Sequence, residues 1–385
     1  MKNVAILGST GTIGRNTLDV IRRHPREFKL TALAAGSNIA LLEEQIREFR
    51  PALVSVANKA DAELIRKIFG KSGLRVTYGP EGAEEVGADS LSDIIVSAIT
   101  GINGLKPTLA AVRAGKRVAL ANKESMVVGG ALLRKAADKA GGSIVPVDSE
   151  HSGVFQCLAG QNQADVGKVT LTASGGPFFR SPLSELKKKT IDETLSHPRW
   201  KMGRKVTVDS ATLMNKGLEL IEARWLFDLP PAKLHILIHP QSIVHALVEF
   251  KDGSILAQLS PTDMKIPIQF ALTYPERFDS VVPPLDLARV RALEFYPVEV
   301  RRYPMIRLAY DALLEGESLP VALNAANELA VEAFLERKIG FTAIGDVVAK
   351  ALDGHRKSKV RGLAAIYEVD RLTREHARKI IEKRC

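Results

Sequence analysis

The sequence has few cysteines, few aromatic residues and no long apolar run. Its two cysteines, Cys157 and the terminal Cys385, provide no disulfide framework and fit a reducing cytoplasm. No apolar run approaches the ~18 residues that a membrane span needs. The N-terminus from Met1 to Gly8 reads as a short strand entering a loop, which lacks the apolar region of a signal peptide. We therefore expect a cytoplasmic, bacterial-style enzyme without a transit-type leader.

The net charge of +10 admits two interpretations. Nucleic-acid binding calls for a basic face interleaved with aromatic side chains, but only 5% of the residues are aromatic. The basic doublets are scattered, and Lys187-Lys188-Lys189 is the only basic run. A solvated surface that steers anionic ligands is the better interpretation. We expect no nucleic-acid partner and no membrane partner.

The order of elements along the 385 residues predicts a three-part α/β enzyme. Strands and helices alternate over residues 1–149, which predicts a Rossmann-like, doubly wound parallel sheet. Residues 150–274 predict an α+β catalytic domain with a mixed or antiparallel sheet, whose expected strands are 169–172, 205–208, 235–238, 244–250 and 254–258. Five prolines over residues 275–304 predict a linker, and helical periods over residues 305–385 predict a C-terminal helical domain.

A glycine-rich segment separates the first expected strand from the first expected helix. Gly8, Gly11 and Gly14 would let the backbone approach a pyrophosphate, whose charge then rests on the helix N-terminus. A tight turn without a ligand is the alternative. The second strand ends in Gly36-Ser37-Asn38, with no Asp or Glu to bind a ribose 2′-OH, which favours NADP over NAD.

Three carboxylates predict a metal site. In an extended segment Asp148 and Glu150 would point to one face roughly 7 Å apart, at the carboxyl edge of the parallel sheet. Lys216 and Glu219 would share one helix face, because they stand three residues apart. Carboxylates without His or Cys suit Mg²⁺ or Mn²⁺. Solvated carboxylates are the better interpretation of each one alone, whereas the agreement of the set favours the metal.

Other segments predict a phosphate site and a lid. Ser174-Gly175-Gly176-Pro177 follows a strand and would expose successive backbone N–H groups to an anion, or else form an ordinary glycine turn. Ser210 is either a second hydroxyl donor or a helix cap. The loop from His197 to Gly203 either closes over a ligand or packs through Trp200. We expect His245 to be an interior histidine.

These segments resemble the 1-deoxy-D-xylulose 5-phosphate reductoisomerase family over essentially the whole chain. The motifs that carry the resemblance are residues 120–124, 147–152, 174–178, 197–203 and 211–219. The resemblance implies an enzyme of isoprenoid precursor biosynthesis that rearranges and reduces 1-deoxy-D-xylulose 5-phosphate to 2-C-methyl-D-erythritol 4-phosphate. It implies NADPH and one divalent cation (Mn²⁺, Mg²⁺ or Co²⁺) as cofactors, a small sugar-phosphate substrate, and a homodimer.

The family's roles carry over to matching positions. The implied cofactor-binding residues are Thr10, Gly11, Thr12, Ile13, Gly36, Ser37, Asn38, Asn122, Glu124 and Gly203. The implied metal ligands are Asp148, Glu150 and Glu219, which with Lys123 are also the implied catalytic residues. The implied substrate-binding residues are Lys123, Ser149, Glu150, Ser174, His197, Ser210, Asn215, Lys216 and Glu219, and the implied flap residues are Trp200 and Met202. Thr12 replaces a common Ser, and Ser37 stands where Lys or Arg is frequent.

Two other functions fit parts of this pattern. A simple NADP-dependent dehydrogenase with structural carboxylates would be indifferent to metal chelation. A non-catalytic NADP-binding sensor would bind nucleic acid through its basic surface and show no turnover. The combination of Lys123, Asp148, Glu150 and Glu219 argues against a sensor, which needs no such site.

Overall fold

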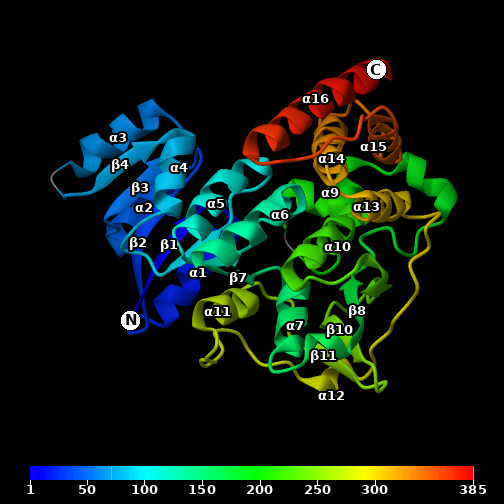
Figure 1. Ribbon diagram of the computed structural model, residues 1–385, viewed down its shortest axis with the longest axis horizontal. Coiled ribbons are helices and arrows are strands. Elements are labelled where there is room, and N and C mark those ends of the chain that lie inside the picture. The colour runs from blue at the N-terminus through cyan, green and yellow to red at the C-terminus, as the bar shows by residue number, and fades with distance from the viewer. Residues whose placement is uncertain (71, 201, 385) are drawn as a thin grey trace. The chain divides into compact units, whose positions relative to one another are not determined.

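The computed structural model of the protein describes residues 1–70, 72–200 and 202–384. The chain forms two compact units (Figure 1). The first contains Met1–Met126, Gly130–Ser152 and Asp263–Pro284, and the second contains Val127–Gly129, Gly153–Thr262 and the chain from Leu285 onward. The division into three domains and a linker stays a prediction. Cys385 and the flap position Lys201 lie outside the described residues.

The first unit is built on a seven-stranded sheet in the order β4-β3-β2-β1-β5-β6-β7, and all neighbouring strands are parallel. This confirms the predicted doubly wound sheet. The central strand has four consecutive residues, from Val4 to Leu7, that are fully buried, as expected of a strand covered on both faces. The strands are β1 Lys2–Leu7, β2 Phe28–Ala34, β3 Leu53–Val56, β4 Arg75–Tyr78, β5 Ile94–Ser97, β6 Arg117–Leu120 and β7 Ser143–Pro146.

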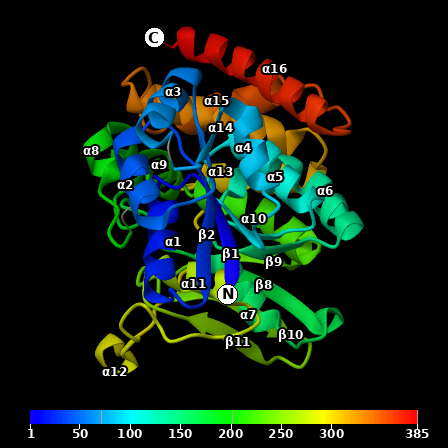
Figure 2. The ribbon, with the colours of Figure 1, turned by 90° about the vertical axis from the view of Figure 1, so that its left-hand side faces the viewer.

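Helices cover both faces of this sheet, with α1 and α2 on one side and α4 and α5 on the other (Figure 2). A later segment, α11 (Lys265–Thr273), returns to pack against α1, β6 and β7. The remaining helical elements up to α7 are α1 Thr12–Arg23, α2 Ile39–Phe49, α3 Lys59–Phe69, α4 Gly79–Gly87, the 3-10 turn η1 Ile102–Gly104, α5 Leu105–Arg113, α6 Lys123–Ala140 and α7 Ser149–Leu158. Helix α6 begins at Lys123, where the Asn122 side chain caps it.

The parallel arrangement brings distant motifs to one edge of the sheet. All seven strands run in the same direction, so their carboxyl ends lie together. The segments that follow these ends are Gly8 to Gly14 after β1, Gly36 to Asn38 after β2, Asn122 to Glu124 after β6, and Asp148 to Glu150 after β7. Every cofactor position predicted in the first unit therefore lies at the ligand-binding edge of such a sheet.

The second unit contains a four-stranded sheet in the order β11-β10-β8-β9. Strands β8 and β9 are parallel and the other pairs are antiparallel, which confirms the predicted mixed sheet. The strands are β8 Val166–Ala173, β9 Leu234–Ile238, β10 Val244–Phe250 and β11 Ile255–Leu259. Among the residues described, β11 is an edge strand, because β10 is its only partner.

The expected strand at 205–208 was wrong, because this segment lies in a helix. Helix α9 (Arg204–Thr212) is followed directly by α10 (Met214–Phe227). The alternation Lys-Val-Thr-Val looks like a strand, but all six residues from Thr207 to Thr212 are buried, so burial does not follow the alternation. The Thr207 hydroxyl also donates to the Gly203 carbonyl one turn earlier at 3.0 Å, which is a helical contact. Tertiary burial therefore overrides the local β preference.

The rest of the second unit is mainly helical. The helical periods predicted over residues 305–385 are confirmed by α13 Pro304–Glu315, α14 Leu319–Leu335, α15 Ala343–Asp353 and α16 Leu363–Glu382. Residues 275–304 are largely irregular, as expected, apart from α12 (Leu287–Val290) and a bridge between Tyr296 and Ile238. The short helical pieces are η2 Gln163–Asp165, η3 Leu183–Lys188, α8 Ile191–Leu195 and η4 Pro231–Lys233. Within the described chain, no helix combines the length and apolarity of a membrane span.

The turn after β1 has no room for a side chain at its third glycine. A Cβ added at Gly14 would lie 2.5 Å from the Ser9 Cα, whereas a Cβ at Gly36 would meet no atom within 4 Å. We predict that Gly14→Ala lowers the free energy of unfolding by about 1–3 kcal/mol through overpacking. Gly36→Ala is the matched control and should be nearly neutral. Urea denaturation measures both, and equal stabilities would contradict this account of the turn.

Candidate active site

The turn between β1 and α1 leaves the first N–H groups of α1 without a side-chain cap. Gly8 has a φ of +92°, and a Cβ there would lie 2.7 Å from the Ala98 carbonyl oxygen. Gly11 is the N-cap of α1 and offers no side chain to the first N–H groups, and the first turn has no acidic residue. Thr10, Gly11, Thr12 and Ile13 are exposed or half-buried. The positive end of the α1 dipole is thus left for a ligand with negative charge.

The segment after β2 has one side chain already in use. The Asn38 side-chain oxygen accepts a hydrogen bond from the Leu41 N–H at 3.1 Å and so caps α2. Its amide nitrogen carries the donors that remain for a ligand. Gly36 and Ser37 are exposed and bring neither positive nor negative charge. This segment therefore offers neutral donors at the end of β2.

The Asn122 side chain has a structural role at the start of α6 that the sequence did not reveal. Its side-chain oxygen accepts from the Ser125 N–H at 2.6 Å, which caps α6. Its amide nitrogen donates to the carbonyl of Gly101 at 3.0 Å and to that of Ile99. The side chain thus ties the start of α6 to the loop after β5. Glu124, which is 6% exposed, lies one residue into the helix.

Asp148 and Glu150 lie close together because they stand at the start of a helix. We had expected them to converge from an extended segment. The Ser152 N–H donates to the Asp148 carbonyl at 2.8 Å, so Asp148 stands at the N-terminus of α7. The Glu150 N–H reaches the Asp148 Oδ1 at 3.3 Å. Each carboxylate offers one oxygen, and these two atoms lie within 4.8 Å of each other. The prediction that the two side chains converge is confirmed, although its geometric reason was wrong.

Other polar groups surround this pair. The Lys123 Nζ lies 2.9 Å from the Asp148 Oδ2, and the Ser149 hydroxyl donates to the Glu150 Oε2 at 2.8 Å. The buried His151 places its Nδ1 3.5 Å from the Asp148 Oδ1. Sequence reasoning gave His151 no role, although its position three residues after Asp148 is a helical spacing that could have indicated the contact.

In the second unit a single residue, Leu213, connects α9 to α10. Leu213 has a φ of +60°, an uncommon conformation for a branched apolar residue. It is 2% exposed and packs with Ala173, Ile238, Tyr303 and Ile306. The Thr212 hydroxyl accepts from the Met214 N–H at 3.3 Å and so supports the turn. Packing therefore holds the start of α10 in place despite the strained backbone.

The first turns of α10 carry three of the predicted site residues, Asn215, Lys216 and Glu219. The Lys216 Nζ is hydrogen-bonded to the Glu219 Oε2, which confirms that the two residues share a helix face. The Asn215 amide donates to the Glu219 Oε1 at 2.5 Å. Glu219 is fully buried and Lys216 is 3% exposed. A buried pair of this kind keeps its geometry because either charge alone would cost several kcal/mol.

A hydrogen-bond relay fixes the Ser174 hydroxyl. The His197 Nδ1 accepts from the N–H groups of Trp200 at 2.9 Å and Arg199 at 3.2 Å. The proton of a neutral ring must then be on Nε2, which lies 3.0 Å from the Ser174 Oγ and donates to it. The Gly176 N–H also donates to this oxygen at 3.1 Å. Since the Ser174 oxygen accepts twice, its own O–H can donate to an anion.

The loop of Gly175 and Gly176, which follows β8, packs against α9. Gly175 and Gly176 both have positive φ, and a Cβ at Gly176 would lie 2.8 Å from the Ser210 carbonyl oxygen. The Gly175 carbonyl accepts from the Tyr303 hydroxyl at 2.8 Å. Ser210 lies in the last turn of α9, so the alternative that it caps the start of a helix is wrong. The loop is therefore a fixed strand end packed on a helix.

The segment from His197 to Gly203 contains no helix or strand in its described part. Trp200 is half-buried and its ring lies 6.4 Å from that of His245, measured between centroids. His245 is 2% exposed, which confirms the expected interior position. Met202 is half-buried, and Gly203 is the N-cap of α9. The segment thus connects the Ser174 relay directly to the helix that carries Ser210.

Known families match most of the chain. Residues 4–130 match the 1-deoxy-D-xylulose 5-phosphate reductoisomerase family, residues 144–227 match its C-terminal domain, and residues 259–376 match a further C-terminal domain of DXP reductoisomerase. A 1-deoxy-D-xylulose 5-phosphate reductoisomerase of Chlorobium limicola is 50% identical over 381 residues, which cover 99% of this chain and 100% of the relative. That of Chlorobaculum tepidum is 49% identical with the same coverage.

Solved structures give the same result. A DOX-P reductoisomerase crystallised with NADPH, fosmidomycin and magnesium has a TM-score of 0.93 and 40% identity, and the match covers 99% of this chain and 98% of that one. The 1-deoxy-D-xylulose 5-phosphate reductoisomerase of Zymomonas mobilis with NADPH has a TM-score of 0.93 and 38% identity, covering 99% of both chains. Coverage of at least 98% on both sides means that the similarity is not confined to the nucleotide-binding part.

Burial lowers the pKa of His197 to about 4, against 6.5 for an exposed histidine. Between these values the unfolded chain binds a proton that the folded chain does not, so stability is lost as the pH falls from 6.5 towards 4. We predict that His197→Gln weakens this pH dependence, as measured by urea unfolding at pH 7.0, 5.5 and 4.5. ¹⁵N NMR of the wild type at pH 6 should show a neutral ring protonated on Nε2.

The exposed His235 provides the matched control, because it lies in the same unit outside this relay. His235→Gln should leave the pH dependence of stability close to that of the wild type. A charged His197 ring at pH 6 would contradict the relay.

Proposed function

The chain belongs to the 1-deoxy-D-xylulose 5-phosphate reductoisomerase family, and we propose that the residues located above perform the family's reaction in this protein. The reaction is the NADPH- and divalent-metal-dependent rearrangement and reduction of 1-deoxy-D-xylulose 5-phosphate to 2-C-methyl-D-erythritol 4-phosphate, a step of isoprenoid precursor biosynthesis. The similarity over 99% of the chain at 50% identity carries this conclusion.

We assign the first unit to the cofactor. The uncapped start of α1, with Thr10, Gly11, Thr12 and Ile13, would hold the pyrophosphate. Gly36, Ser37 and the amide nitrogen of Asn38 would surround the adenosine 2′-phosphate with neutral donors, and Asn122, Glu124 and Gly203 would complete the site. When bound, NADPH supplies the hydride for the reduction. The protein's contribution is to hold and orient it at the carboxyl edge of the sheet.

We assign the divalent cation to Asp148, Glu150 and Glu219. Their donors are all carboxylate oxygens, which fit Mg²⁺, Mn²⁺ or Co²⁺ in preference to a softer metal. A cation held there polarises the substrate carbonyl and stabilises negative charge that develops on oxygen. The Lys123 ammonium, 2.9 Å from Asp148, is placed to hold a proton beside these carboxylates, and Ser149 offers a hydroxyl next to Glu150.

We assign the substrate phosphate to Ser174, Ser210, Asn215 and Lys216, with His197 acting through the Ser174 hydroxyl. The two hydrogen bonds that Ser174 accepts orient its O–H before the phosphate arrives, so little ordering is required on binding. Phosphate bound away from the reacting carbons can then supply the energy that closes a flap. Trp200 and Met202 would belong to that flap and exclude water from the reaction.

A metal requirement separates this assignment from a simple dehydrogenase. We predict that NADPH oxidation with 1-deoxy-D-xylulose 5-phosphate stops in EDTA and returns with Mg²⁺ or Mn²⁺, with the branched polyol phosphate as product. The measurement is the loss of reduced-cofactor absorbance with product identification. Glu219→Gln should lower kcat by about 10²-fold or more while the NADPH Kd stays nearly unchanged.

Glu249 is a control, because it lies in the same unit on β10 and pairs with Lys168, and both residues are half-exposed. Glu249→Gln should leave kcat close to that of the wild type. Turnover that persists in EDTA, or normal turnover of Glu219→Gln, would remove these carboxylates from the metal site.

We also propose a cytoplasmic homodimer. The edge strand β11 exposes Ile255 at 56% and Leu256 at 41%, a combination that favours pairing with a second chain. We predict that the wild type sediments as a dimer and that Leu256→Lys shifts it towards the monomer, because a charge opposes edge pairing. A monomeric wild type would contradict the dimer, and cell fractionation tests the location.

A further inference from the structure

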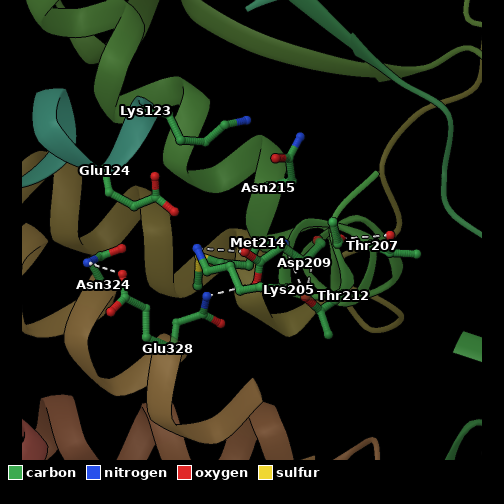
Figure 3. A network of polar contacts seen from close by, with 12 residues as sticks. Lys123, Glu124, Lys205, Thr207, Asp209, Thr212, Met214, Asn215, Asn324 and Glu328 are labelled. Atoms are coloured by element: carbon green, nitrogen blue, oxygen red, sulfur yellow. Dashed lines mark hydrogen bonds and ion pairs between the residues drawn. The ribbon is translucent and has the colours of Figure 1, made fainter. Parts of the chain in front are cut away.

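A buried carboxylate on α9 has both of its oxygens held by other elements of the second unit. Asp209 is 1% exposed, and its Oδ1 accepts a hydrogen bond from the Asn327 amide of α14 at 2.8 Å. Its Oδ2 lies 2.9 Å from the Lys205 Nζ, one turn earlier on α9 (Figure 3). Asn327 is fully buried. Asp209 therefore joins α9 to the C-terminal helices through a contact shielded from water.

The partner helix carries further buried polar groups. Asn324, three residues before Asn327, donates to the Glu328 Oε1 at 3.1 Å, as Figure 3 shows. Glu328 is paired with Arg374 of α16, which also bonds to Asp370 at 2.7 Å. Most other buried residues of α14 are Ala, Leu or Val. Polar side chains held in an otherwise apolar interface can specify one register between helices, as a single buried polar residue does in coiled coils.

Helix α9 lies between the two groups of side chains assigned to phosphate. On one side, the Gly175-Gly176 loop packs directly on the Ser210 backbone, with no room for a Cβ at Gly176. On the other side, α9 passes through the single residue Leu213 into α10, whose first turns carry Asn215 and Lys216. A shift of α9 by one residue would move Ser210 by about 1.5 Å along the axis and turn it by about 100°. The fit of the whole phosphate site therefore depends on the register of α9.

We propose that Asp209 and Asn327 are positioning residues for the phosphate end of the substrate, acting through Ser210 and the Gly176 loop. Neither side chain needs to touch the substrate. Their hydrogen bond fixes the rotation of α9, so that the adjacent Ser210 hydroxyl points to the same place in every molecule. This inference rests on the proposed function, because it takes the phosphate assignment as its starting point.

The test compares Asn327→Asp with the exchanged pair D209N/N327D. Asn327→Asp removes the donor and sets two carboxylates against each other, so the KM for the substrate and the Ki of inorganic phosphate should both rise about tenfold or more. The exchanged pair restores an amide donor opposite a carboxylate and should recover both constants to within about threefold of the wild type.

Asn324→Asp is the matched control. It makes the same substitution on the same helix at a residue that is also fully buried, but this residue contacts Glu328 instead of Asp209. It should lower the Tm as Asn327→Asp does while leaving the phosphate Ki near the wild-type value. If both variants raise the phosphate Ki equally, or if the exchanged pair shows no recovery, the two residues act only through general stability and the proposal is overturned.

Ser210→Ala separates this inference from the function on which it rests. If Ser210→Ala leaves the phosphate Ki unchanged, the assignment of phosphate to Ser210 fails. If Ser210→Ala raises the Ki and Asn327→Asp does not, only the positioning role fails. A wild type that does not turn over the substrate at all would reject the proposed function itself.

Discussion

The pairing of buried charge is the constraint on which the candidate site depends. Lys123 with Asp148, Lys216 with Glu219, and Lys205 with Asp209 each place an ammonium against a carboxylate that is at most 10% exposed. A charge removed from water without its partner costs several kcal/mol, so each pair holds its two side chains in one arrangement. The candidate functional groups are thereby positioned before any ligand binds. As a consequence, replacing one residue of such a pair by a neutral one leaves the charge of its partner buried without a counter-charge.

The sequence predicted the first unit well because its information is local and periodic. Buried strands alternate with helices, and the carboxyl ends of parallel strands must lie together, so the Gly8 turn and the Asp148 segment could be assigned to one edge. The mixed sheet and the late helices were also predictable from hydrophobic period. Helix α9 was not, because Lys205 to Val208 alternate like a strand and only tertiary burial makes them helical. Asp148 and Glu150 converge for a reason the sequence did not show, because α7 begins immediately after β7.

Contacts between residues far apart in the chain could not be predicted from the sequence. Asn327 lies 118 residues from Asp209, and nothing in the pattern of either helix marks the pair. The capping role of Asn122 needed the position of the loop after β5, and the tautomer of His197 needed the backbone of residues 199 and 200. The two alternative functions give way to the reductoisomerase family because the similarity extends over both units. A nucleotide-binding loop alone would have left them open.

The two ends of the proposed substrate site use charge differently. The proposed metal ligands are carboxylates with lysines beside them, whereas the phosphate end uses hydroxyls, an amide, glycine backbone and one lysine that is already paired with Glu219. A phosphate bound mainly by neutral, preoriented donors gains its binding free energy from geometry more than from net charge. Such a site loses affinity steeply when its donors move, because each hydrogen bond depends on direction. That dependence is why the register of α9, set by a contact far along the chain, matters for a ligand that the contact does not touch.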